Sequence, residues 1–177
     1  MFARVILISM TMLSASLTVS SQQELPAAQN PGAVKVEMTT LVDWRSGGLE
    51  PLKPYQSGSV IRFQVLMTNS SAEKLHVLVL DRYYQSRPRL TRNDEVVPYR
   101  SSISKLLINK EKNINFYQLQ FSRLLEPGKP TPVEILDLRD WYEPLAPGSY
   151  QLRTRYRFDV QGEWTPDSAP MKFEVAP

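Results

Sequence analysis

Apolar and polar residues alternate with a period of two along several stretches of this chain, and this alternation predicts β-strands. The clearest stretch is residues 59–69, whose apolar face is formed by Ile61, Phe63, Val65 and Met67. Residues 34–39 and 171–175 show the same alternation. Residues 75–84 are apolar on both faces at first, which is typical of a central strand or of a strand at an interface.

Turn signals separate these strands. Asn93 and Asp94 tolerate the positive φ of tight turns and predict a hairpin. Residues 138–142 predict one helical turn at a sheet corner, whereas residues 101–112 fit either a helical turn or a short edge strand. Further strands are expected at 114–121, at 133–135 and from 149 onward. About seven or eight short strands without a long helical period predict an all-β fold, an antiparallel β-sandwich.

The first 21 residues have a different character from the rest of the chain. Arg4 precedes an uncharged, largely apolar run that ends at Val19, and Ser20 and Ser21 follow it. This is the pattern of a secretory signal peptide, although an uncleaved membrane anchor is the alternative. The apolar run, roughly 15 residues, is shorter than a membrane span needs. We therefore expect a secreted or periplasmic protein with a signal peptide at 1–21, a flexible leader at 22–33 and one sandwich domain at 34–177.

Composition narrows the possible chemistry and partners. The chain has no cysteine, which excludes disulfides and thiolate metal sites. Cleavage after residue 21 would remove Arg4 and lower the formal net charge from +3 to +2. Such a small excess of positive charge does not indicate a nucleic-acid partner. The expected partner is a protein or polysaccharide in the cell envelope or outside the cell.

No constellation of residues in the sequence points to catalysis. His76 is the single histidine, whereas zinc sites without thiolates need several imidazoles. No G-x-S-x-G elbow, G-x-G-x-x-G turn or P-loop is present. The carboxylates of Asp137, Asp140 and Glu143 lie near one another in the sequence, but Asp137 and Asp140 are more simply read as acids at a helix end, where an acid accepts backbone N–H bonds. We expect no catalytic residue, no metal and no cofactor.

The most distinctive charged feature is a row of three arginines, Arg153, Arg155 and Arg157. A strand would place all three on one outward face. The opposite, core-facing row would be formed by Leu152, Thr154, Tyr156 and Phe158. The arginines could bind carboxylates, phosphates or an acidic polysaccharide. The alternative is a solvated surface on which the arginines pair with cross-strand acids such as Glu174.

Aromatic residues form a second candidate surface. Tyr83 and Tyr84 lie at the end of an expected strand, and Trp164 lies in the loop of residues 162–170. Exposed aromatic rings near arginines suit the recognition of sugars or proteins. Trp44 and Trp141 are expected instead to fill the core or a corner.

One segment resembles a known structural motif. P-G-S-Y at residues 147–150 precedes an expected strand and resembles the tyrosine corner of immunoglobulin-like and fibronectin-like sandwiches. The resemblance implies that Tyr150 bonds back to the preceding loop. The wider pattern includes N-S-S at 69–71, L-E-P-G-K-P at 125–130 and W-T-P-D-S at 164–168. It is similar to small secreted immunoglobulin-like modules of environmental bacteria and, more loosely, to the sandwich of BsuPI-type proteinase inhibitors.

The resemblance covers residues 58–177 and rests on turn and corner signals, which speak for fold far more than for function. The expected function is binding or structural support by an exported module without catalysis. Inhibition of a proteinase through an extended loop is the alternative that the looser resemblance implies. Hydrolysis is a third hypothesis, and the single histidine counts against it.

Overall fold

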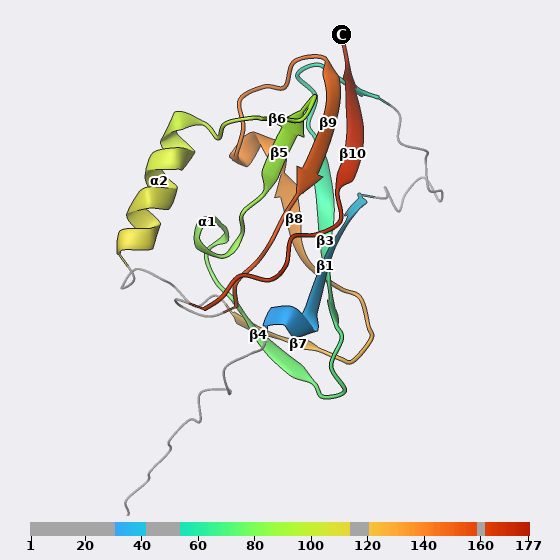
Figure 1. Ribbon diagram of the computed structural model, residues 1–177, viewed down its shortest axis with the longest axis vertical. Coiled ribbons are helices and arrows are strands. Elements are labelled where there is room, and N and C mark those ends of the chain that lie inside the picture. The colour runs from blue at the N-terminus through green and yellow to red at the C-terminus, as the bar shows by residue number, and fades with distance from the viewer. Residues whose placement is uncertain (1–30, 42–53, 114–120, 159–161) are drawn as a thin grey trace, which may run out of the picture.

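The computed structural model describes residues 31–41, 54–113, 121–158 and 162–177 (Figure 1). The expected signal peptide, most of the expected leader, Trp44 and most of the strand expected at 114–121 lie outside these residues. The described residues form mainly antiparallel strands with few helices, which confirms the all-β prediction. No helix within these ranges is long and apolar enough to cross a membrane.

The first sheet consists of three antiparallel strands in the order β1-β3-β8, namely β1 (Val34–Thr40), β3 (Arg62–Asn69) and β8 (Thr131–Asp137). The alternation that predicted β3 is confirmed, because Phe63, Val65 and Met67 are fully buried. The aromatic ring of Phe63 and the branched side chain of Val65 pack well on a pleated surface that is buried on one side. A β-bulge shifts the register of β3 against β8 next to Val65.

The second sheet has five strands in the order β2-β10-β9-β5-β6, which are β2 (Tyr55–Gln56), β10 (Met171–Ala176), β9 (Gly148–Arg153), β5 (Arg89–Arg92) and β6 (Glu95–Val96). Its pairings are antiparallel except for β2 with β10. Its apolar side faces the first sheet, since the rings of Phe63 and Phe173 lie 5.4 Å apart. A separate antiparallel pair is formed by β4 (Leu75–Val79) and β7 (Phe121–Leu125).

The described residues contain ten strands, more than the seven or eight expected. Two of these strands, β2 and β6, have only two residues each. β6 was implied as the second strand of the predicted hairpin, whereas β2 is too short to leave an alternation in the sequence. The hairpin prediction is confirmed, because Asn93 and Asp94 connect β5 to β6 with φ values of 49° and 66°. The corner prediction is also confirmed, since Leu138–Asp140 forms a 3-10 turn.

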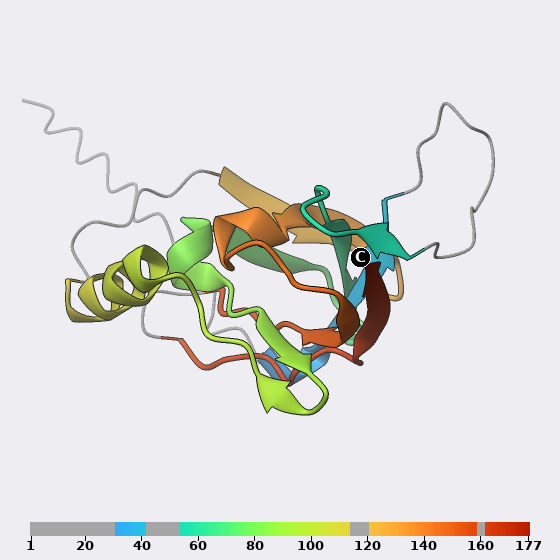
Figure 2. The same cartoon turned by 90° about the horizontal axis from the view of Figure 1, so that it is seen from above.

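Two helices correct the sequence interpretation. The strand expected at 75–84 ends at Val79, because the Asp81 side chain accepts a 2.9 Å hydrogen bond from the Tyr83 backbone N–H and caps α1 (Arg82–Gln85). The ambiguous segment is α2 (Ser101–Lys112), a helix of 12 residues. Its buried side chains, Ile103 and Leu107, are four residues apart and share one helical face. Figure 2 shows α1 between α2 and the sheets.

Candidate functional site

The segment that carries the predicted arginine row is only partly a strand. β9 ends at Arg153, and residues 154–158 continue in an irregular extended form. On one side, the backbone N–H of Arg87 donates to the Arg155 carbonyl oxygen at 3.1 Å. On the other side, the N–H of Thr165 donates to the Tyr156 carbonyl oxygen at 2.7 Å. The segment is therefore hydrogen-bonded to a loop on each side, where a strand within a sheet would have a neighbouring strand.

The prediction that all three arginines point outward is wrong for Arg157. Arg153 and Arg155 are exposed, whereas Arg157 is only 5% exposed. Its Nε–H donates to the Tyr84 carbonyl oxygen at 3.1 Å, and its guanidinium lies 3.5 Å from the centroid of the Tyr84 ring. The long strand that would have kept Arg157 outward is absent, and α1 and α2 cover this end of the segment.

Two further arginines complete the cluster, and the sequence interpretation did not include them. Arg89 on β5 is the direct cross-strand partner of Arg153 on β9. Arg87, two residues earlier, is bonded through its backbone to Arg155. The period-two arrangement of Arg87 and Arg89 around Pro88 was visible in the sequence. Only the pairing of β5 with β9, which is not a local property of the sequence, places these residues beside the predicted row.

Trp164 forms the centre of the cluster. Three guanidinium groups lie over its ring, with distances to the ring centroid of 4.9 Å for Arg87, 5.1 Å for Arg155 and 4.6 Å for Arg157. Stacking of this kind on an indole is favourable and holds long side chains in defined positions. The ring is half-buried rather than freely exposed. It therefore acts as a platform for the arginines.

Glu111 near the end of α2 neutralises part of this charge. Its Oε1 accepts a hydrogen bond from Arg157 at 2.8 Å and a short one from Arg87. Burial lowers the pKa of Arg87 and Glu111 opposes that shift, but an arginine stays protonated in any such setting. Arg87 and Arg157 are thus a recessed pair that shares one carboxylate.

The three remaining arginines, Arg89, Arg153 and Arg155, are exposed, and we call them the arginine face. None of them forms an ion pair with an acid in the described part of the chain. The acid expected to pair with the row, Glu174, lies opposite Ser149 instead. The prediction of Glu174 as a partner is therefore wrong, because the register of β10 carries it toward the other end of β9.

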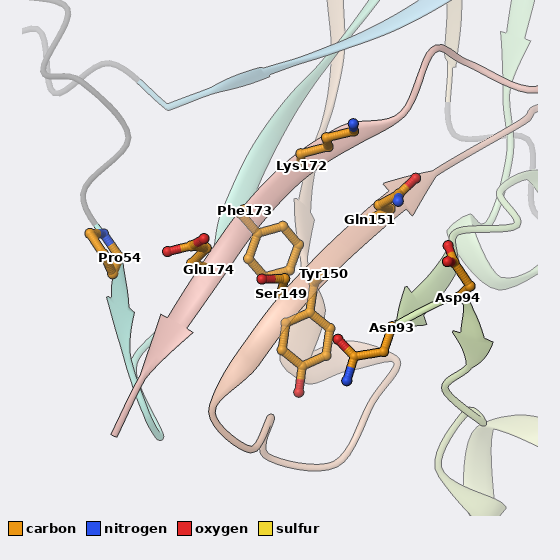
Figure 3. A pocket seen from close by; sticks show the side chains of 9 residues that line it. All are labelled: Pro54, Asn93, Asp94, Ser149, Tyr150, Gln151, Lys172, Phe173 and Glu174. Carbon is orange, nitrogen blue, oxygen red and sulfur yellow. The ribbon is translucent and has the colours of Figure 1, made fainter.

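A trough extends the arginine face along the same sheet. Gln151 lies on the same side of β9 as Arg153, two residues away, and lines a cavity of about 470 Å³ (Figure 3). Lys172 flanks Gln151 on β10, and the hairpin residues Asn93 and Asp94 flank it across β5. The lining combines apolar residues with polar ones, and its charged side chains, Asp94, Lys172 and Glu174, carry both signs. The trough and the arginine face therefore lie on the same side of β9, one after the other along the strand.

The two predicted tyrosines are not exposed. Tyr84 is 1% exposed and lies beneath Arg157. Tyr83 is partly buried, with its ring centroid 5.1 Å from that of Trp141. Because both belong to α1 rather than to the end of a strand, one of them turns into the core. Trp141 is fully buried, which confirms its expected place in the core.

Asp137 is a helix-end acid that accepts a backbone N–H bond, as expected. Oδ1 of Asp137 accepts a 3.0 Å hydrogen bond from the Arg139 backbone N–H, and Oδ2 lies 2.8 Å from both Arg139 and Arg62. Hydrogen bonding to Arg139, supported by Arg62, holds the pKa of Asp137 well below its usual range. Asp140 pairs with Arg82 at 2.5 Å.

His76 is exposed on β4. The described residues contain no group of three or more His, Asp or Glu side chains that could hold a metal ion.

Comparison with known proteins gives no independent assignment for this surface. The chain matches no protein-family model, and no curated protein matches it in sequence. What the surface can do therefore follows from its own geometry and charge: it can hold an anion between exposed guanidinium groups, beside an indole that keeps the neighbouring arginines in place.

Proposed function

We propose that this chain is a binding module without catalysis, and that its arginine face binds an acidic polysaccharide. The observation that carries the proposal is the cross-strand pair of Arg89 and Arg153, which are exposed and have no acid partner in the described ranges. Like charges directly opposite each other on neighbouring strands are destabilising. A carboxylate or sulfate placed between the two guanidinium groups would remove that repulsion.

The surroundings support binding rather than mere solvation. Stacking on Trp164 holds Arg155 in place before any ligand arrives, so less side-chain entropy is lost on binding. Guanidinium groups bind carboxylates through two parallel hydrogen bonds, which gives geometric selectivity for acidic groups. The trough beside Gln151 lies next to the arginine face on the same side of β9, so an extended chain suits this surface better than a single small ion.

The proposal includes export and an immunoglobulin-like or fibronectin-like character for the sandwich. Export rests on the pattern of residues 1–21, and N-terminal sequencing of the mature protein should begin near Gln22. The immunoglobulin-like character is supported by the bond from the Tyr150 hydroxyl to the backbone four residues earlier. Proteinase inhibition and hydrolysis stay predictions of the sequence, and none of the contacts above specifically favours either.

The test compares two variants that lose the same charge. Arg89→Gln/Arg153→Gln removes the cross-strand pair, whereas Lys74→Gln/Lys105→Gln removes two exposed lysines from other surfaces. Affinity for polygalacturonate and dextran sulfate should fall about 2- to 30-fold in the arginine variant alone, since each exposed pair contributes roughly 0.2–1 kcal/mol. Binding should also weaken between 0.1 and 1 M salt, because the Debye length shrinks from about 10 to 3 Å.

Two further measurements complete the test. Neutral dextran should not be retained by any of the proteins. The arginine variant should be at least as stable as the wild type, because it loses a like-charge pair. Equal loss of affinity in both variants would mean that binding depends only on the net charge of the protein, which would contradict the proposal. Selective binding of an acidic protein in place of both polysaccharides would assign the surface to a protein partner.

A further inference from the structure

A second cavity, which no residue of the arginine face lines, lies between β4, α1 and β8. Its volume is about 350 Å³, at the small end of the range for ligand sites. The walls are mostly aliphatic and aromatic, with contributions from Met67, Val77, Val79, Leu80, Val133 and Phe158. Ile135 and Arg82 at its border are about half exposed, so the cavity opens to solvent there.

An acidic residue faces this apolar interior. Glu134 on β8 is the register partner of Val65, which is fully buried, so its side chain points to the inner side of the sheet. One carboxylate oxygen, Oε2, accepts a short hydrogen bond from the Tyr156 hydroxyl. The other oxygen, Oε1, is shut off from solvent and has no hydrogen-bond partner in the described part of the structure. A buried carboxylate oxygen without a donor is costly and calls for a specific explanation.

The other polar groups around the cavity are already bonded. Gln85 donates through Nε2 to the Leu78 carbonyl oxygen at 2.6 Å and accepts through Oε1 from the Leu80 N–H at 3.0 Å. Arg82 pairs with Asp140 at 2.5 Å, so the mouth of the cavity carries compensated charge. The unused hydrogen-bonding capacity is therefore concentrated on Glu134 Oε1.

The chemistry of that atom selects the ligand. An apolar pocket with one unpaired acidic oxygen suits a molecule with an aliphatic body and a cationic N–H donor at its end. A cation would supply both the missing hydrogen bond and the missing counter-charge, whereas an alcohol would supply only the first. A carboxylate ligand would be repelled by an ionised Glu134. Burial raises the pKa of Glu134, which is what a carboxyl group without a counter-charge does in an apolar setting.

We propose that this cavity binds a small primary alkylammonium ligand, with its N–H groups donating to Glu134 Oε1 and its alkyl chain against Val77, Val79 and Phe158. The site is independent of the arginine face. A cavity of about 150 Å³ is enough for benzene, so one of about 350 Å³ accommodates an alkyl chain of four carbons or longer.

The first experiment uses the unaltered protein, so it does not depend on a variant that folds. Titration with n-butylammonium, n-butanol and butyrate is followed by methyl NMR of Val77 and Val79. Butylammonium should shift both methyl signals saturably, butanol should bind more weakly by about tenfold or more, and butyrate should not bind. Equal affinities for the amine and the alcohol would overturn the proposal, as would the absence of any saturable shift with the amine.

Two variants then test the role of the carboxylate. Glu134→Gln keeps the shape of the side chain and should weaken butylammonium binding by about tenfold or more. Tyr156→Phe removes the hydroxyl that shares the carboxylate and leaves the charge, so it should retain or strengthen binding. Undiminished binding in a folded Glu134→Gln protein would show that the carboxylate is a structural group. The Arg89→Gln/Arg153→Gln variant should bind the amine like the wild type, so failure here is separable from failure of the polysaccharide proposal.

Discussion

The Tyr150 hydroxyl donates a 2.6 Å hydrogen bond to the carbonyl oxygen of Ala146. Tyr150 is a buried residue of β9, and its ring stacks on Phe173 of β10 at 5.4 Å. The hydroxyl thus ties the loop before β9 to the sheet that carries the candidate site. This bond is the one that the sequence P-G-S-Y implied, and the structure confirms it.

Tyr150→Phe should lower the free energy of unfolding by about 1 kcal/mol, the typical net value of one hydrogen bond. The loss stays small because Ala146 is exposed, so water can bind its carbonyl oxygen once the hydroxyl is gone. Urea denaturation of variant and wild type measures the difference. Identical midpoints would show that the corner bond does not stabilise the fold.

Tyr142→Phe should be the more damaging of two similar substitutions. The Tyr142 hydroxyl is buried, accepts a 3.1 Å hydrogen bond from the Leu90 backbone N–H and donates at 2.8 Å to the Pro88 carbonyl oxygen. Pro88 keeps a second donor, the Tyr99 hydroxyl, but Leu90 would be left with a buried N–H group and no partner. The expected loss is about 2–3 kcal/mol. A loss no larger than that of Tyr150→Phe, in the same urea series, would contradict this ranking.

The sequence was most informative where structure is local. Alternation predicted β3 and β10, and the tolerance of Asn93 and Asp94 for positive φ predicted the hairpin, because each depends on neighbouring residues alone. It was less informative at residues 101–112, whose apolar positions are few. The helix there is stabilised mainly by packing of Ile103 and Leu107 against the core, and that packing is a tertiary property.

The candidate site was predictable only in part, for the same reason. Arg153 and Arg155 were correctly expected on the surface. The burial of Arg157 depends on Glu111 and Tyr84, which lie 46 and 73 residues away in the sequence. The pairing of Arg89 with Arg153 depends on the strand order of the second sheet. No periodicity within one segment carries that information.

Glu111→Gln should destabilise the fold although Glu111 is almost half exposed. Its carboxylate is the acid shared by Arg87 and Arg157, and Arg157 is nearly inaccessible to water. Loss of that charge leaves a buried guanidinium with only neutral acceptors, at an expected cost of about 1–3 kcal/mol. Trp164 fluorescence should change as well, because both arginines stack on its ring.

Glu126→Gln is the matched control for that change. Glu126 forms an exposed ion pair with Lys129 at 3.2 Å, so its neutralisation should alter the free energy of unfolding by no more than about 0.5 kcal/mol. Equal stabilities of the two glutamine variants would mean that Glu111 is an ordinary surface acid. An unchanged Trp164 spectrum in Glu111→Gln would separately argue against the stacked arrangement.

Asp137 should make the fold sensitive to acid. Its pKa is lowered in the folded state, first by the Arg139 hydrogen bond and then by Arg62, so the unfolded chain binds a proton more readily. Asp137 therefore stabilises the fold at pH values above its pKa in the unfolded chain, which is near 4. This stabilisation is lost as the pH falls toward the lower pKa of the folded state. Asp137→Asn should lose less stability than the wild type below about pH 4. Parallel pH profiles of unfolding would exclude this role.

Glu134 should produce the opposite pH dependence in a different range. Burial raises the pKa of Glu134 in the folded state, and the Tyr156 hydrogen bond only partly offsets the shift. Just above the unfolded value, about 4.3, the folded protein then holds a proton that the unfolded chain has released. The contribution of Glu134 to the free energy of unfolding therefore falls as the pH rises from the unfolded pKa toward the raised pKa of the folded state. Tyr156, whose pKa is raised by burial, stays protonated throughout this pH range.

Glu134→Gln removes this titration without changing the size of the side chain. The variant should therefore gain stability relative to the wild type as the pH rises above the unfolded pKa of Glu134, and the gain should level off once Glu134 is ionised in both states of the wild type. Urea denaturation at half-unit pH steps measures the difference curve. Asp137 acts below this range, so its effect does not overlap. A difference that is constant from pH 4 to 7 would mean that the carboxyl group titrates normally, and that its Oε1 atom is hydrated in solution.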